Sequence, residues 1–76
     1  MPNDWSHDED LILAEAVLRH IREGISVIDA FDEVGKKLNR SASNCGLRWN
    51  NTVRFDYKNG ILAARKIKYN LKYGRD

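Results

Sequence analysis

The chain has 76 residues, of which 42% are hydrophobic and 32% charged, and its formal net charge is +2. This length fits one domain, and no apolar stretch approaches the roughly 20 residues that a membrane-spanning helix needs. The single cysteine, Cys45, excludes an internal disulfide and a cysteine-based zinc site, and the polar start predicts no signal peptide, so we expect a cytoplasmic protein.

The first predicted helix begins after Ser6 and ends before Gly24. Ser6 and Glu9 have the spacing of a capping box, in which each side chain accepts a hydrogen bond from the other residue's backbone. Trp5 directly precedes the cap, and glycine is the residue most often found just after a helix. The apolar face is expected to comprise Leu11, Ala14, Val17, Leu18 and Ile21.

A second helix is predicted to begin near Ser26 and to end at Asn39-Arg40. Gly35 lies inside it at a cost near ~1 kcal/mol relative to alanine, which we attribute to close approach of another helix. Ser41 or Ser43 restarts the chain as an N-cap, and a break of about three residues is the length of a helix-turn-helix connection. The expected core face comprises Val27, Ala30, Phe31, Val34 and Leu38.

The third predicted helix runs from about Ala42 to about Phe55 and carries two distinct faces. Gly46 lies at the edge between these faces. The stripe expected to be buried comprises Ala42, Cys45, Trp49 and Val53. The opposite face comprises Ser43, Leu47, Asn50, Asn51 and Arg54. The side chains expected to anchor the core are Trp5, Phe31, Cys45 and Trp49.

A basic, helix-prone segment, Ile61 to Tyr73, follows a break at residues 57–60. It could be a fourth helix packed on the core, the start of a coiled coil, or a basic arm that orders only on DNA. A homodimer through this C-terminal segment therefore remains open. The expected organisation is a three-helix domain at residues 4–56 and a basic helical extension at residues 57–76.

The charges are divided between the two halves of the chain. Residues 1–33 hold nine acidic and two basic residues, a net charge of −7, whereas residues 34–76 hold eleven basic and two acidic residues, a net charge of +9. A basic half of this kind indicates a polyanionic partner. The alternative is that the opposite charges merely hold the helices together.

The exposed face of the third helix offers chemistry suited to DNA. Asparagine can form two hydrogen bonds with adenine in the major groove, and a leucine such as Leu47 can contact a thymine methyl group. The alternatives are that Leu47 is an ordinary exposed leucine and that Asn50-Asn51 marks a fraying helix end. The predicted phosphate contacts are Lys36, Lys37, Arg40, Arg48 and Arg54.

Three stretches together resemble one Myb/SANT repeat. They are Trp5-Ser6 with Asp8-Glu9-Asp10, Phe31 with Val34-Gly35 and Leu38, and the run Arg40 to Asn50 with its Cys-x-x-Arg-Trp-Asn string. The resemblance implies an all-α, three-helix, helix-turn-helix bundle in which Phe31 stands for the middle tryptophan and the third helix enters the major groove. Carried over by position, the base-reading residues are Ser43, Leu47 and Asn50, with Gly46 and Asn51 as further candidates.

More narrowly, residues 11–50 resemble the RsfA-type prespore-specific transcription regulators of spore-forming bacteria. This resemblance implies a bacterial transcription regulator that binds double-stranded DNA sequence-specifically, at the nucleoid, during sporulation. The face departs from the usual pattern, because Gly46 and Leu47 stand where polar or basic side chains are common.

No phosphate-binding loop, paired-carboxylate site or nucleophile motif is present, so an enzyme is not expected. His7 and His20 are 13 residues apart, without metal-ligand spacing, and both are expected at the surface. We therefore predict no cofactor, no metal, no membrane and no small-molecule substrate. The rival interpretation is a SANT-like protein-interaction module or dimerising adaptor that does not read DNA bases.

Overall fold

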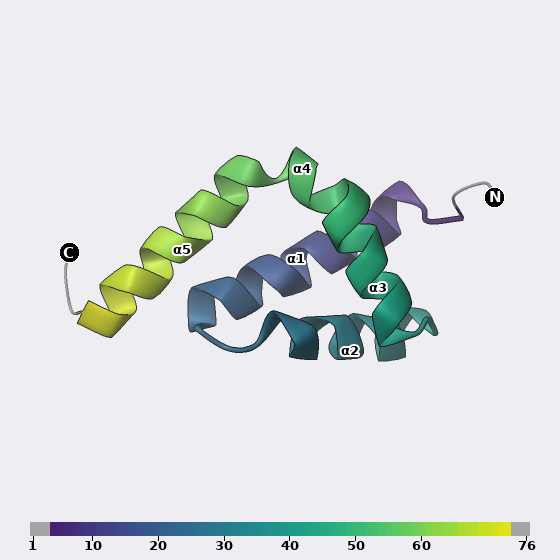
Figure 1. Cartoon of the computed structure of the whole chain (residues 1–76), viewed down its shortest axis with the longest axis horizontal. Helices are drawn as coiled ribbons and strands as arrows, with labels where there is room; N and C mark the ends of the chain where they lie inside the picture. The colour runs from purple at the N-terminus through teal and green to yellow at the C-terminus, as the bar shows by residue number, and fades with distance from the viewer. Residues whose placement is uncertain (1–3, 74–76) are drawn as a thin grey trace.

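The computed structural model describes residues 4–73, and this part of the chain is helical and contains no strand. The last three residues of the predicted extension lie outside the described residues. The expected all-α fold class is thus confirmed (Figure 1). The elements are α1 (His7–Glu23), α2 (Val27–Leu38), α3 (Ala42–Arg48), the π-helix η1 (Trp49–Val53), α4 (Arg54–Asp56) and α5 (Lys58–Tyr73).

α1 begins and ends where local sequence signals place it. The Ser6 hydroxyl accepts a hydrogen bond from the Glu9 N–H at 3.1 Å, and the Glu9 carboxylate accepts one from the Ser6 N–H at 2.9 Å. Gly24 adopts a left-handed conformation with φ of 72°, which ends the helix. Both the predicted capping box and the predicted stop are confirmed.

The buried face of α1 is wider than the predicted stripe. Leu11 is 41% exposed, whereas Leu13 and Ala16 are buried beside the expected Ala14 and Val17. The reason is that α1 lies between other helices: it packs against α2 and α5 and also contacts η1. A helix that is covered on several sides buries a broad sector of its surface. A prediction that assumes one narrow apolar stripe then places the edges of the buried surface at the wrong residues.

His20 was expected at the surface, and the structure corrects this. Its side chain is buried, with the ring Nδ1 2.8 Å from the Ser26 carbonyl oxygen and Nε2 3.2 Å from a Glu33 carboxylate oxygen. A buried polar ring needs such partners, and these two come from the start of α2 and its middle. His20 therefore fastens the end of α1 to α2, while Arg19 also pairs with Glu33.

α2 turns sharply into α3 at a position where only glycine fits. Asn39 ends α2 in a left-handed conformation with φ of 58°, and the Arg40 N–H donates to the Gly35 carbonyl at 2.8 Å. A Cβ on Gly35 would lie 2.5 Å from the Arg40 carbonyl oxygen. The predicted close approach is real, and the backbone of the turn, continuing into the first residue of α3, makes it.

The third predicted helix is one continuous helical run from α3 to α4 that contains a π-turn at η1. Ser41 caps it by accepting a hydrogen bond from the Asn44 N–H at 3.0 Å. The Arg54 N–H donates to the carbonyl of Trp49, five residues earlier, which is the π pattern. The helix therefore does not fray at Asn50-Asn51, and the turn there is wider than in an α-helix.

α5 is a fourth helix packed on the bundle, which is one of the three predicted alternatives. It begins at Lys58, three residues before the expected Ile61, and it packs against α1 (Figure 1). Ala64 is buried, and a Cβ on Gly60 would lie 3.3 Å from the Leu18 side chain. α5 thus lies close to α1 at Gly60. Among the described residues, no helix is long and apolar enough to cross a membrane.

The core lies where α1, α2 and the α3–η1 run meet. Trp5 and Trp49 are 9% and 6% exposed, and the half-buried Phe31 packs against the buried cluster. Burying a few large side chains is how a chain of this size gains stability. The largest fully buried side chains are Leu13, Val17, Val34, Cys45 and Val53.

The Gly35 contact yields a test of the turn geometry. Gly35→Ala should lower the free energy of unfolding by about 1–3 kcal/mol, because the new methyl group collides with backbone that cannot move aside. Gly60→Ala is the matched control, since its methyl group meets only the flexible end of Leu18. In that control the higher helix propensity of alanine should at least offset the energetic cost of the contact with Leu18, so the stability should not fall. Thermal unfolding followed by circular dichroism measures both, and a Gly35→Ala melting point at or above wild type would contradict the geometry.

Candidate DNA-binding surface

The face of the α3–η1–α4 run that points away from the core is open. The exposed fraction of Leu47 is 59%, and no acidic residue lies between Ser41 and Phe55. The surface that the sequence predicts on this helix is therefore present as one exposed, polar to basic face, which we call the α3 face. Its residues, all exposed, are Ser43, Leu47, Asn50, Asn51 and Arg54.

Gly46 does not belong to this face. It is buried, and a Cβ at this position would lie 3.3 Å from two ring atoms of Phe31. The glycine thus lets α3 sit directly on the aromatic ring of α2. This placement runs against the prediction that Gly46 contacts a base, because the residue has no open surface to present.

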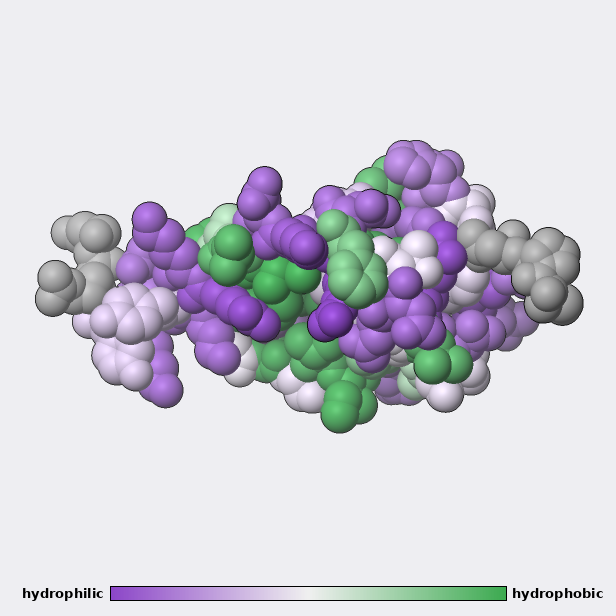
Figure 2. Space-filling model, turned by 45° about the horizontal axis from the view of Figure 1, so that its top comes forward, coloured by the Kyte–Doolittle hydropathy of each residue, from purple (hydrophilic) through white to green (hydrophobic). Residues whose placement is uncertain are grey.

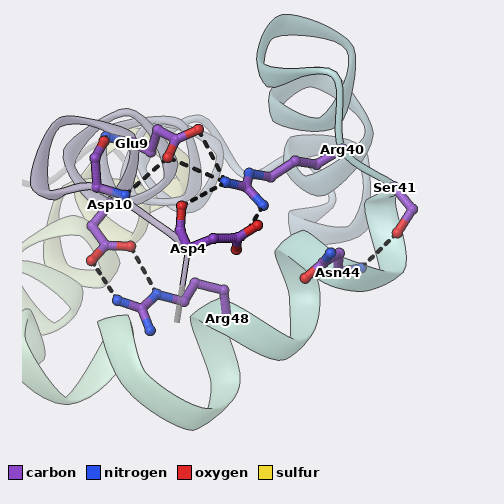
Figure 3. Close-up of polar contacts among 8 residues, drawn as sticks. Asp4, Glu9, Asp10, Arg40, Ser41, Asn44 and Arg48 are labelled. Carbon is purple, nitrogen blue, oxygen red and sulfur yellow. Dashed lines mark hydrogen bonds and ion pairs between the residues drawn. The ribbon is translucent and has the colours of Figure 1, made fainter. Parts of the chain in front are cut away.

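Arg48 is held inside the structure by α1. Its guanidinium donates to both carboxylate oxygens of Asp10, at 2.9 and 2.7 Å, and the two side chains are only 14% and 21% exposed (Figure 3). These hydrogen bonds keep the pKa of Arg48 above its ordinary value. A two-pronged pair of this kind fixes geometry as well as charge. Arg48 therefore sets where α3 lies relative to the first turns of α1.

Arg40 makes a second attachment to the same end of α1. Its guanidinium lies 4.4 Å from the ring centre of Trp5 and donates to the Asp4 side chain at 3.2 Å and to the Glu9 carboxylate at 3.2 and 3.3 Å (Figure 3). Its side chain is 14% exposed. The stacked and hydrogen-bonded guanidinium joins the α2–α3 turn to the cap of α1.

The five predicted phosphate contacts thus fall into two groups. Arg40 and Arg48 form ion pairs with carboxylates of α1. For these two residues the structure agrees with the alternative explanation of the charge distribution, in which opposite charges hold the helices together. Lys36, Lys37 and Arg54 are exposed. Lys36 pairs with Asp32 of the same helix at 3.3 Å, an exposed pair that water and salt weaken.

The described residues offer no sign of reactive or metal chemistry on this surface. No group of three or more His, Cys, Asp or Glu side chains that could hold a metal ion occurs within residues 4–73. Burial raises the pKa of the Cys45 thiol, which disfavours the reactive thiolate. What the arrangement can do is present hydrogen-bonding and positively charged side chains on a rigidly held helix.

A three-helix bundle with a short second turn and an open third helix is a domain of the helix-turn-helix class. The family model of the Myb-like DNA-binding domain matches residues 5–70 of this chain. The chain therefore belongs to the Myb-like DNA-binding domain family, a family of binding domains and not of enzymes, and the predicted resemblance is confirmed. The match extends into α5.

A comparison with curated proteins finds similarity to the sporulation-specific transcriptional regulator GerR of Bacillus subtilis (strain 168). The two are 54% identical over 68 residues, which cover 90% of this chain and 35% of GerR. The predicted kinship with sporulation regulators is thereby confirmed, and the chain spans about a third of the length of that relative. No solved structure matches the chain significantly.

Sequence reasoning missed the acidic partners of the two arginines. Asp8, Glu9 and Asp10 are explained locally as acids that favour the positive end of the α1 dipole. Nothing local indicates that Glu9 and Asp10 also bind arginines 31 and 38 residues further along. The sequence carries only a weak indication of the π-turn, which is the pair of consecutive asparagines, poor helix formers, within it.

The acid-labile contacts give a pH prediction. The Ser6 N–H and then Arg40 hold the pKa of Glu9 below its ordinary value of 4.5, and Arg19 and His20 do the same for the pKa of Glu33. A carboxyl whose pKa is lower in the folded state contributes stability above the unfolded value. That stability should be fully present at neutral pH and should fall as the pH drops below about 4.5.

Urea unfolding at about pH 7, 5 and 3 measures this dependence. Glu9→Gln should lower the free energy of unfolding at neutral pH. On acidification, the free energy of unfolding of this variant should fall less than that of the wild type. Glu15→Gln, an exposed change on the same helix, should keep the wild-type dependence. An unchanged acid dependence in Glu9→Gln would rule out this role for its carboxylate.

Proposed function

We propose that this chain is the double-stranded-DNA-binding domain of a bacterial transcription regulator of sporulation, with the α3 face placed in the major groove. The single observation that carries the proposal is this open, acid-free face on a helix fixed to the core. Membership of the Myb-like family and similarity to a sporulation regulator support it. A protein with this role works at the nucleoid, in the cytoplasm.

The contacts are divided between bases and phosphates. Asn50 and Asn51 present amides that can bind adenine, and Leu47 presents methyl groups to thymine. Ser43 lies one turn before Leu47 on the same face. Lys36, Lys37 and Arg54 supply the cations that position the domain on the backbone without reading sequence.

Arg40 and Arg48 act differently in this proposal. Their guanidinium groups hold α3 against α1 and so orient the reading face before DNA arrives. A surface held in its bound geometry loses less conformational entropy on binding. Both arginines are therefore assigned a positioning role, and Gly46 is assigned to packing against Phe31.

The rival function is a protein-interaction module that does not read bases. The 59% exposure of Leu47 is compatible with it, because exposed apolar side chains also serve protein contacts. The absence of acids on the α3 face favours DNA. The two functions differ in their dependence on salt and on DNA sequence, which the following measurements separate.

Binding to duplex DNA should weaken steeply with salt. Neutralising three phosphates with Lys36, Lys37 and Arg54 predicts a slope of log K against log salt of about −3. Arg54→Gln should flatten this slope by about one unit, while Arg22→Gln, on the far end of α1, should leave it unchanged. Fluorescence anisotropy at several salt concentrations measures the slope, and salt-insensitive or absent binding would exclude the DNA function.

Specificity should depend on Asn50. Asn50→Ala should weaken binding to a selected site by about 1–3 kcal/mol and binding to a scrambled duplex very little, because only the selected site offers the matching base. Asn59→Ala removes an exposed amide from α5 and serves as the matched control. Paired titrations on a site selected from random oligonucleotides give the comparison. Equal weakening on both duplexes would show that the α3 face does not read the groove.

A further inference from the structure

A groove of about 470 Å³ lies where α4 meets α5, apart from the α3 face except at Arg54. Figure 2 looks onto this side of the molecule and shows hydrophobic surface bordered by hydrophilic side chains. Phe55 is 51% exposed and Leu62 is 61% exposed, so large apolar side chains stand open beside cations. The groove is lined by Arg54, Phe55, Lys58, Ile61, Leu62 and Arg65.

The same chemistry continues along α5 as a regular stripe. Five residues at alternating steps of four and three lie on one face of the helix, and all five are exposed. Cations recur every seven residues and apolar side chains also recur every seven residues. Tyr69 is 56% exposed and its ring lies 4.5 Å from that of Tyr73. The α5 stripe comprises Lys58, Leu62, Arg65, Tyr69 and Lys72.

This spacing is typical of the contact positions, or seam, between two helices packed side by side. In such pairs, side chains at steps of three and four interdigitate with those of a second helix laid alongside. Three of the five seam positions are basic, and α5 contains no acidic residue between Lys58 and Tyr73. Two copies of α5 would face cation against cation in a parallel pair, and in an antiparallel pair neither copy would supply an acidic side chain to neutralise them. The charge pattern selects a different, acidic helix over a second copy of this chain.

The stripe is also a poor match to a phosphate backbone. Phosphate contacts need cations and hydrogen-bond donors, and the exposed hydrocarbon side chains of Phe55 and Leu62 contribute nothing to them. Contiguous exposed apolar surface is instead a mark of protein interfaces, where tyrosine and arginine are prominent. The apolar half of the stripe is the observation that favours a protein partner over DNA.

We propose that the α5 stripe and its groove bind an acidic amphipathic helix of a partner protein. The partner's apolar side chains, at steps of three and four, pack on Phe55, Leu62 and Tyr69. Its carboxylates pair with the cations that alternate with these side chains. This second surface would let the domain contact a protein while the α3 face contacts DNA, and it does not rest on the proposed DNA function.

The test is an NMR titration of the full chain with a synthetic peptide as long as α5, 16 residues. The peptide carries leucine at steps of three and four and glutamate at most other positions, with both ends blocked. A scrambled peptide of the same composition destroys the apolar face and keeps the charge. We expect saturable chemical-shift changes confined to α4 and α5, as for a weak, transient contact of small area.

Matched variants separate the stripe from the rest of α5. Leu62→Ala and Lys58→Gln should each weaken binding about fivefold or more. Leu71→Ala changes an exposed leucine of α5 outside the stripe and Arg22→Gln removes a cation of α1, and both should change affinity less than about twofold. Circular dichroism checks that all four variants fold.

Each other outcome overturns the proposal. Absence of saturable binding, equal binding of the scrambled peptide, or shifts centred on α3 excludes a specific acidic-helix site. A chain that sediments as a dimer and becomes monomeric on Leu62→Ala assigns the stripe to a second copy. Random-sequence duplex DNA that shifts the stripe, with affinity lowered by Leu62→Ala, assigns it to nucleic acid.

Discussion

The whole arrangement depends on two arginines that reach back to the first turns of α1. Arg48 grips Asp10, and Arg40 stacks on Trp5 while binding Glu9. The helical run from α3 to α4 rests mainly on α2 through α3. A helix of this length is marginally stable by itself, so its stability and its orientation must come from tertiary contacts. The acids at the start of α1 supply them, and the same acids favour the positive end of the α1 dipole.

This use of charge explains the uneven distribution along the sequence. The acidic first half partly neutralises the basic second half inside the domain, through Arg40 and Arg48. Two of the surfaces on which basic residues are left exposed differ in character. The α3 face combines Arg54 with amides and a hydroxyl, which suits hydrogen bonding to base edges and phosphates. The α5 stripe combines cations with aromatic and aliphatic side chains, which suits a protein helix.

Local signals in the sequence predict much of this fold. The capping box at Ser6, the stop at Gly24 and the helix start near Ser26 depend on residues within three or four positions, and each is found where expected. Of the two serines predicted as possible caps of the third helix, Ser41 is the one that caps it. Burial of His20 could not be predicted, because its partners Ser26 and Glu33 meet it only when α2 folds against α1. The packing of α5 on α1, where Gly60 lies close to Leu18, likewise joins residues far apart in the sequence. Exposure of the α3 face follows from periodicity, whereas the internal pairing of two predicted phosphate contacts is tertiary.

The π-turn connects the two surfaces. In an uninterrupted α-helix the Arg54 N–H would bond to the carbonyl of Asn50, but here it bonds to that of Trp49. Trp49 and Val53, the two ends of this wider turn, are both buried, and π-turns are frequent at functional sites. Arg54, the next residue, ends the α3 face and also lines the groove beside Phe55, over whose ring its guanidinium lies at 4.9 Å. One guanidinium can satisfy either a phosphate or a partner carboxylate, so ligands on the two surfaces would compete for it. By linkage, any such competition acts equally in both directions, and Arg54 is the residue through which it would pass.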